Sequence, residues 1–302
     1  MTQRRDKRVD SARALEGLHD GATVAIGGSM FHNKPMALIR EIVRRRVKDL
    51  VVIAVPQASI DVDLLIGAGC VAEVRVPYLG FDHLGLAPSL RRRATENSLA
   101  LWDCDETQLL AGLEAAAKDL PSGMVKAGVG TDLPRTNADL VETSDPITGE
   151  PVIAVAAIAP DITLLHASQA DVNGNLRYTG YSFGDLLLAE ATKRQGGLVV
   201  ASVEEIIPEL VVSSTPFATV IAQLLVDAVV EAPFGAHPCS SHGDYAQDEV
   251  ALQKYITAAR SGGAAFDAYV KHHVDDAAIH ADYLDRSLTP SRMVELRRDV
   301  RV

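Results

Sequence analysis

Short apolar runs alternate with helical patterns along much of the chain, and this alternation constrains its fold more than any other feature. Between the first two runs, residues 35–46 place Met36, Ile39 and Val43 on one face of an amphipathic helix that has Pro35 in its first turn. Repeated strand–helix alternation predicts an α/β protein with an open, mostly parallel sheet flanked by helices. The runs predicted as strands are residues 23–27, 50–55, 71–76, 99–102, 152–159, 162–167 and 198–203.

The remaining segments complete a single predicted domain over residues 1–302. Residues 107–118 carry a second buried helical stripe, and residues 139–151, which contain Asp-Pro-Ile-Thr-Gly-Glu-Pro, predict a turn or hairpin between two halves of the sheet. Residues 220–230 are apolar and are predicted to form a helix. The last part, about residues 246–302, is predicted to be a charged, helical extension of the same domain.

Charge and hydropathy exclude several classes of partner. The formal charge is −11, so the chain lacks the basic surface that nucleic-acid binding requires. The first 15 residues are charged throughout and contain no apolar core of signal-peptide length. Residues 151–160 form the longest uncharged apolar stretch, which is far shorter than the roughly 20 residues that span a bilayer. We therefore expect a cytoplasmic protein with no nucleic-acid or membrane partner.

Cysteines predict neither a disulfide nor a metal site. Cys70, Cys104 and Cys239 are odd in number, widely separated and without Cys-x-x-Cys spacing. A reactive Cys104 is a minor alternative to ordinary buried packing.

The first segment that predicts chemistry is the glycine turn at residues 25–35, where a strand runs through Gly27 and Gly28 into a helix. Two glycines let the backbone approach a ligand closely, and N–H groups at a helix start can face a phosphate or an oxyanion. A tight connection without a ligand is an equal alternative. The turn lacks the spacing of dinucleotide folds and of the P-loop, which disfavours NAD and ATP.

The second segment, residues 91–107, places Glu106 near the end of a predicted strand, where open α/β sheets bind their ligands. That position makes Glu106 a candidate base. The alternative is structural, because Asp103 followed by Glu106 has the spacing of a helix capping box. On spacing alone, capping is the stronger interpretation.

The third segment, residues 166–180, has a polar turn rich in Asp, Asn and Gly. Residues 171–175 superficially match the start of a calcium-binding loop, but no bidentate Glu follows, so calcium is not expected. Asn173 and Gly174 predict a hairpin turn.

Taken in order, these segments and two further ones resemble the α subunits of family I coenzyme A transferases. The matching stretches are residues 25–35 with Asn33 and Pro35, 128–133 (Gly-Val-Gly-Thr-Asp-Leu), 166–175, 203–207 and 232–238 (Ala-Pro-Phe-Gly-Ala-His-Pro). The resemblance covers about residues 10–260 and implies the CoA-transferase or NagB-like fold. It also implies a β-subunit partner, in an enzyme with two copies of each subunit, and an acyl-CoA substrate whose CoA is the only cofactor.

In the transferases, the resemblance implies a nucleophilic Glu that belongs to the β subunit. Residues 96–98 (Glu-Asn-Ser) look like that motif but lie within the α-type pattern, where the motif does not belong. Lys126 stands where glutaconate-type α subunits tend to carry Arg. Because Lys cannot hold a carboxylate bidentately, this departure argues against a dicarboxylate acceptor.

The whole chain is also similar to the α subunits of a hydrolase branch that opens a steroid ring as a CoA thioester. This similarity implies hydrolytic, retro-Claisen carbon–carbon cleavage of a cyclic keto-acyl-CoA with Glu106 as the acid/base. The expected oxyanion and substrate-binding residues are Gly27, Gly28, Ser29, Asn33 and Lys126. True CoA transfer and a non-catalytic metabolite-binding subunit remain the alternatives.

Overall fold

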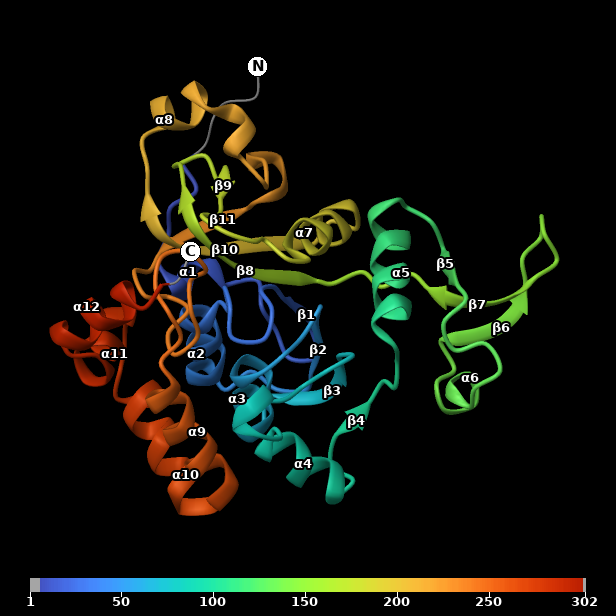
Figure 1. The fold of residues 1–302 in the computed structure, drawn as a ribbon, viewed down its shortest axis with the longest axis horizontal. Helices are drawn as coiled ribbons and strands as arrows, with labels where there is room; N and C mark the ends of the chain where they lie inside the picture. The colour runs from blue at the N-terminus through green and yellow to red at the C-terminus, as the bar shows by residue number, and fades with distance from the viewer. Residues whose placement is uncertain (1–5, 301–302) are drawn as a thin grey trace.

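The computed structural model describes residues 6–300 and confirms the predicted α/β fold, a mostly parallel sheet flanked by helices (Figure 1). The strand order is β11-β10-β8-β1-β2-β3-β4, in which all pairs are parallel, and the short β9 pairs antiparallel with β8. The strands are β1 Thr23–Ile26, β2 Leu50–Ala54, β3 Val71–Arg75, β4 Ala100–Leu101, β8 Ile162–Ala170, β9 Leu176–Arg177, β10 Leu198–Ile206 and β11 Ala228–Glu231.

Helices cover both faces of this sheet, because alternate residues of its central strands are apolar in both directions. In β1, Val24 and Ile26 join a core with α2 (Met36–Arg45), α3 (Ile60–Gly67) and α9 (Glu249–Ser261). Ala25 points the other way and joins a core with α5 (Glu106–Ala117) and α7 (Asp185–Arg194). Helix α4 (Pro88–Thr95) lies in the first layer, against α3 and α9.

The strand order places a topological switch point between β1 and β8. From β1 the chain proceeds outward through β2, β3 and β4, whereas β8, β10 and β11 extend the sheet in the opposite direction. Open α/β sheets bind ligands at the carboxyl ends of strands beside such a point. The glycine turn that follows β1 lies there.

A second, three-stranded antiparallel sheet has the order β5-β7-β6 and lies beyond α5 (Figure 1). Its strands are β5 Ser122–Val125, β6 Leu140–Ser144 and β7 Pro151–Ala156. The hairpin predicted at residues 139–151 is therefore present. It builds a separate sheet, however, and does not join two halves of the main one.

The helix predicted at residues 220–230 is wrong. The segment contains a single 3₁₀ turn, Gln223–Leu225, followed by strand β11 at the edge of the main sheet. Val226, Val229 and Val230 are buried, and β-branched residues pack well on a pleated sheet. A short apolar run does not distinguish a buried strand from a buried helix by its pattern alone.

The last residues are helical and pack against α2. Buried Arg40 donates to the His237 carbonyl at 3.0 Å, and its guanidinium lies 3.5 Å from the centre of the Tyr283 ring. His280 contacts the Pro233 carbonyl at 2.7 Å. The remaining helices are α1 Ser11–Ala14, α6 Leu133–Thr136, α8 Glu209–Ser214, α10 Gly263–Val270, α11 His280–Ser287 and α12 Pro290–Arg298, with a π turn at Lys271–Asp275 and 3₁₀ turns at Asp82–Leu84 and Pro216–Ala218. Within residues 6–300, no helix has the length and apolarity to cross a membrane.

Acid is expected to loosen this C-terminal segment. Burial, together with nearby positive charge, lowers the pKa of His273 to about 4 and that of His280 to about 3, and burial lowers the pKa of His237. Histidines in the unfolded chain bind protons below pH about 6.5, so unfolding is favoured by up to about 1.4 kcal/mol per pH unit for each histidine as the pH falls further. The protection factors of α11 and α12 in hydrogen exchange, taken relative to the intrinsic rate at each pH, should fall between pH 7 and 5, and His280→Gln should reduce this fall. Equal protection at both pH values would contradict the prediction.

Candidate active site at the sheet switch point

The glycine turn after β1 is closed by its own backbone. Gly28 adopts φ +72°, and a Cβ atom built there would lie 2.4 Å from the His32 carbonyl oxygen and 2.5 Å from that of Asn33. A Cβ atom at Gly27 would lie 2.4 Å from a side-chain carboxylate oxygen of buried Asp185, which would have to move. Glycine is therefore required at Gly28, where the close contacts are backbone and φ is positive, and at Gly27 it leaves room for the Asp185 side chain.

The N–H groups of this turn all donate within the chain. Gly27 donates to the Leu164 carbonyl at 2.9 Å as part of the sheet, and Ser29 donates to the His32 carbonyl at 2.9 Å. Gly28 donates to Asp185 Oδ1 at 2.8 Å. The oxyanion role expected for Gly27, Gly28 and Ser29 stays a prediction, and it requires one of these donors to change partner when a substrate arrives.

Asp185, which sequence reasoning missed, is a buried carboxyl group beside the turn. It is the first residue of α7, and its second oxygen accepts from the Tyr178 hydroxyl at 2.8 Å. Burial raises the pKa of Asp185 to about 6, although the bonds from Gly28 and Tyr178 favour the charged form. A strongly perturbed carboxyl group next to a switch-point turn is typical of functional sites. The sequence around Asp185 shows no helical periodicity or motif that would single this residue out, so its role could not be predicted from the sequence.

Lys34 holds the opposite side of the turn. Its ammonium group is fully buried and contacts Asp61 Oδ2 at 3.0 Å and the Gln57 carbonyl at 2.8 Å. It also lies 3.3 and 3.4 Å from the carbonyl oxygens of Gly27 and Gly28. The turn is thus fixed between a buried cation on its carbonyl side and a buried carboxyl group on its N–H side.

Removing Lys34 is expected to destabilise the chain strongly. Lys34→Met leaves Asp61 as a buried charge without its cation, and the breaking of such pairs costs about 3–5 kcal/mol. Urea unfolding should show this loss. Replacing both partners, as Lys34→Met with Asp61→Leu, should recover most of it. If Lys34→Met alone were as stable to urea as the parent, the Lys34–Asp61 ion pair would not be what stabilises the turn.

Asn33, which is predicted to bind substrate, joins two loops. Its side-chain amide donates to the Tyr181 carbonyl at 2.8 Å and accepts from the His242 backbone N–H at 2.7 Å. Next to these contacts, four aromatic rings pack against one another with 5.2–6.4 Å between the centroids of contacting pairs: those of His32, Tyr181, Phe183 and His242. Tyr181 is 71% exposed, so this cluster presents aromatic surface beside the turn. A direct contact of Asn33 with substrate stays a prediction.

Glu106 is the first residue of α5 and does not cap it. Asp105 is the N-cap, its carboxylate accepts from Thr107 N–H at 2.8 Å, and Gln108 completes the capping box. The interpretation of Asp103 and Glu106 as a capping box is therefore wrong, because the helix begins two residues later than that spacing requires. Glu106 is partly exposed and forms no hydrogen bond or ion pair with any other described residue. Its carboxylate is thus uncommitted, and its role as acid/base stays a prediction.

Lys126 belongs to a different part of the molecule. It follows β5 in the second sheet and forms an exposed ion pair with Glu150. No contact of Lys126 with the glycine turn occurs among the hydrogen bonds of the described chain. Its predicted role in substrate binding requires that the ion pair open.

A second feature that the sequence did not predict is a buried polar network around His166. His166 lies between Ser202 Oγ and Glu204 Oε1, each at 2.9 Å, and Glu204 accepts the backbone N–H groups of Phe234 and Gly235 at 2.7 and 3.0 Å. The order Ser–His–Glu looks like a hydrolytic triad. Ser202 and His166 are completely buried, however, so the network anchors residues 232–238 and exposes no nucleophile.

Comparison with known proteins places this chain in a defined family. The family model described as coenzyme A transferase matches residues 8–232. The cholesterol ring-cleaving hydrolase IpdA subunit of Rhodococcus jostii is 35% identical over 86% of this chain and 90% of its own length. An uncharacterised protein of Archaeoglobus fulgidus is 32% identical over 97% of this chain, which spans only 65% of that protein.

The solved structure of glutaconate coenzyme A-transferase from Acidaminococcus fermentans has the same fold. It superimposes with a TM-score of 0.90 at 29% identity, over 96% of this chain and 95% of that one. Membership of this family supports an α/β enzyme that acts on CoA thioesters. The chain belongs to the coenzyme A transferase family, as its motifs indicated.

Proposed function

We propose that this chain is the α subunit of a heteromeric enzyme that opens the ring of a cyclic keto-acyl-CoA by hydrolysis, in steroid degradation. The observation that carries the proposal is the uncommitted carboxylate of Glu106, at the start of a helix whose cap is formed by other residues. The similarity to the Rhodococcus hydrolase subunit supports the substrate class. A β subunit, in two copies with two of this chain, would complete the site.

In the proposed reaction, Glu106 removes a proton from water, whose oxygen adds to the ring ketone. The bond between the ketone carbon and the carbon next to the thioester then breaks, so the ketone becomes a carboxylic acid and the electron pair forms a thioester enolate. Protonated Glu106 returns its proton to that carbon. Charge on the reacting oxygens requires donors, each worth about 3–4 kcal/mol when well placed. The Gly28 N–H, released from Asp185, is our candidate donor.

Steady-state assays of the complex with its β subunit test the proposal. Incubated with a cyclic keto-acyl-CoA and no free carboxylic acid, the complex should form the ring-opened acyl-CoA at full rate, and hydroxylamine should not inactivate it. This chain alone should be inactive. Turnover that requires an acceptor acid would overturn the proposal.

CoA transfer is the second candidate, because one subunit of the 3-oxoadipate CoA-transferase of Pseudomonas knackmussii is 31% identical over 85% of this chain. The catalytic Glu would then come from the β subunit. Exchange of CoA between two acids through a hydroxylamine-sensitive enzyme thioester would identify it. Ligand binding without turnover in the full complex would instead identify a metabolite-binding subunit.

A further inference from the structure

We propose that the neutral imidazole of His242 donates a hydrogen bond from Nε2 to a substrate oxygen that gains negative charge during the reaction. The proposal rests on the proposed function in placing the reacting carbonyl groups at the glycine turn. The N–H groups of Gly27, Gly28 and Ser29 all donate within the chain, so none of them is free to meet such an oxygen without losing a bond. His242 supplies a donor that is free.

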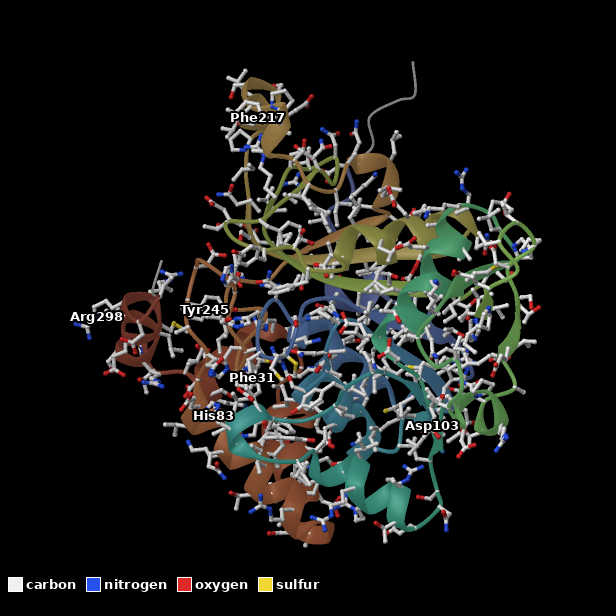
Figure 2. All side chains as sticks on the ribbon, turned by 45° about the vertical axis from the view of Figure 1, so that its right-hand side comes forward. Phe31, His83, Asp103, Phe217, Tyr245 and Arg298 are labelled. Atoms are coloured by element: carbon white, nitrogen blue, oxygen red, sulfur yellow. The ribbon has the colours of Figure 1, made fainter. Side chains whose placement is uncertain are left out.

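His242 lies directly beside the glycine turn. Its loop pairs with the loop that follows the turn, since the Ser240 N–H donates to the Phe31 carbonyl at 2.7 Å. The rings of His32 and His242 lie edge to face, with their centroids 5.5 Å apart. Phe31 and Tyr245, one from each loop, are buried in the same core (Figure 2). The core therefore holds the two loops, and the two imidazoles on them, together.

The contacts of the His242 ring determine its tautomer. Nδ1 accepts the Tyr181 backbone N–H at 3.1 Å, so in the neutral ring the proton is on Nε2. Nε2 forms no hydrogen bond with any residue from 6 to 300 and is not one of the buried unpaired atoms of that range. Its N–H group is therefore open to a ligand.

The ring is held in place before a substrate arrives. The His242 backbone N–H donates to Asn33 Oδ1 at 2.7 Å, so both the backbone and the ring of this residue are anchored. A Cβ atom at Gly180 would lie 1.7 Å from Nδ1, because the ring packs closely on the backbone just before Tyr181. A donor that does not have to reorganise is the kind that stabilises developing charge most effectively.

His32 has the opposite tautomer. The single hydrogen of the Ser240 hydroxyl is donated to the Phe31 carbonyl at 3.0 Å, so this oxygen accepts the Nδ1–H of His32 at 2.6 Å. Burial, together with the nearby His242 and Lys34, lowers the pKa of His32. His32 is therefore a neutral ring with an acceptor at Nε2, and His242 is the donor of the pair.

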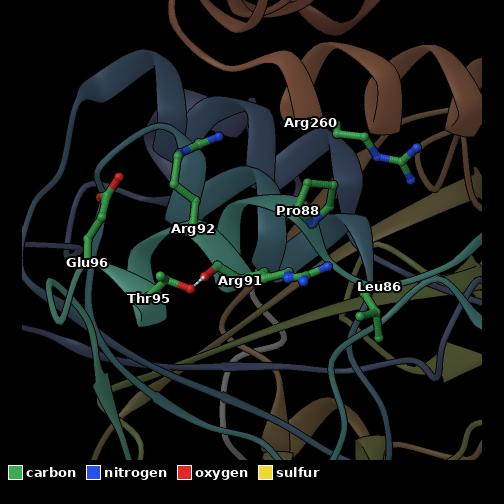
Figure 3. A pocket seen from close by; sticks show the side chains of 7 residues that line it. All are labelled: Leu86, Pro88, Arg91, Arg92, Thr95, Glu96 and Arg260. Carbon is green, nitrogen blue, oxygen red and sulfur yellow. Dashed lines mark hydrogen bonds between the residues drawn. The ribbon is translucent and has the colours of Figure 1, made fainter.

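The cationic side chains that could serve as alternative donors are engaged or lie elsewhere. Lys34 and Lys126 are held in ion pairs. Three arginines line a separate hollow between α4 and the C-terminal end of α9, which no residue of the glycine turn lines (Figure 3): Arg91, Arg92 and Arg260. A neutral imidazole N–H is also sufficient for the task, since it polarises a carbonyl group in other enzymes while keeping its proton.

Two substitutions of His242 separate this role from a structural one. His242→Asn places an amide oxygen near the position of Nδ1, so it still accepts the Tyr181 N–H, but it has no donor near the position of Nε2. His242→Gln places an amide NH₂ group near Nε2 but leaves the Tyr181 N–H without its acceptor. In the complex with the β subunit, single-turnover ring opening by His242→Asn should be about 10²-fold slower than in the parent, at an unchanged melting temperature. His242→Gln should keep more of the rate in spite of a lower melting temperature.

His19→Asn is the matched control. His19 is exposed and precedes β1, so it lies at the opposite edge of the sheet from the glycine turn, and its loss should change neither turnover nor stability. A normal rate in His242→Asn would overturn the proposal. A rate in His242→Asn above that in His242→Gln would do the same, because it would show that only the bond to Tyr181 matters.

Nitrogen-15 NMR tests the tautomers without turnover. In the complex, with only the histidines of this chain labelled, Nδ1 of His242 should be unprotonated at neutral pH and Nδ1 of His32 protonated, and His242→Asn identifies the His242 signals. A protonated Nδ1 in His242 would overturn the proposal. Failure of the proposed function is distinguishable, because the parent would then open no ring, and the same variants would be compared in CoA exchange. Failure of this inference alone leaves ring opening normal in both the parent and His242→Asn.

Discussion

Glu106→Gln is expected to lower ring-opening turnover by about 10²–10⁴-fold while the complex stays folded. Gln is nearly isosteric with Glu but cannot take a proton from water. Because Asp105 and Gln108 cap α5, the substitution leaves the start of the helix intact. The measurement is single-turnover hydrolysis without an acceptor acid, with the melting temperature recorded in parallel.

Two variants on the same helix provide the controls. Glu106→Asp keeps the carboxylate but withdraws it by one methylene, so it should retain part of the rate. Glu114→Gln removes the same charge from an exposed pair with Lys118, two turns further along, and should be nearly silent. Normal hydrolysis by Glu106→Gln would remove the acid/base assignment and the main reason to prefer hydrolysis over transfer.

Gly28→Ala is expected to destabilise the chain by about 2–5 kcal/mol and to abolish activity in any complex that still assembles. The added Cβ would lie 2.4 Å from the His32 carbonyl oxygen and 2.5 Å from that of Asn33. Both oxygens belong to the backbone, so rotation of a side chain cannot relieve the clash. The cost combines overpacking with a left-handed conformation, at about 1–3 and 1–2 kcal/mol respectively. Denaturant unfolding of this chain measures it.

Gly21→Ala separates these two contributions. Gly21 also has a positive φ, +80°, but a Cβ atom there would meet nothing within 4 Å. Gly21→Ala should therefore lose only the stability that the left-handed conformation costs, about 1–2 kcal/mol, and should keep full activity. Equal losses in the two variants would mean that the crowding at Gly28 is relieved by movement of the turn.

The sequence predicted those parts of the fold whose signal is local. Helix α2 was foreseen within a residue at either end because its apolar stripe and Pro35 both mark it, and β1 ends one residue before its predicted end. The prediction of a helix at residues 220–230 was wrong because the end of this segment pairs as a strand with β10, and that pairing cannot be seen in the local pattern.

In the candidate site, too, the residues that are adjacent in sequence could be predicted, and those that only folding brings together could not. Gly27 and Gly28 were found because a strand, two glycines and a helix are adjacent along the chain. Asp185 was not, because only folding brings it within 2.8 Å of the Gly28 N–H from 157 residues away. The cap of α5 depended on which of three closely spaced acids begins the helix, and periodicity does not locate a helix end that closely.

Asp185 is both the partner of the Gly28 amide and the first residue of α7. Leu188 and Ala191 of that helix share a core with Leu109 and Leu113 of α5, the helix that begins with Glu106. Glu106, the predicted proton acceptor, and the Gly28 amide are thus linked through the packing of α5 against α7. A methyl group gained or lost in that contact would shift one against the other, so substrate preference in this fold can drift through packing changes that never touch the substrate.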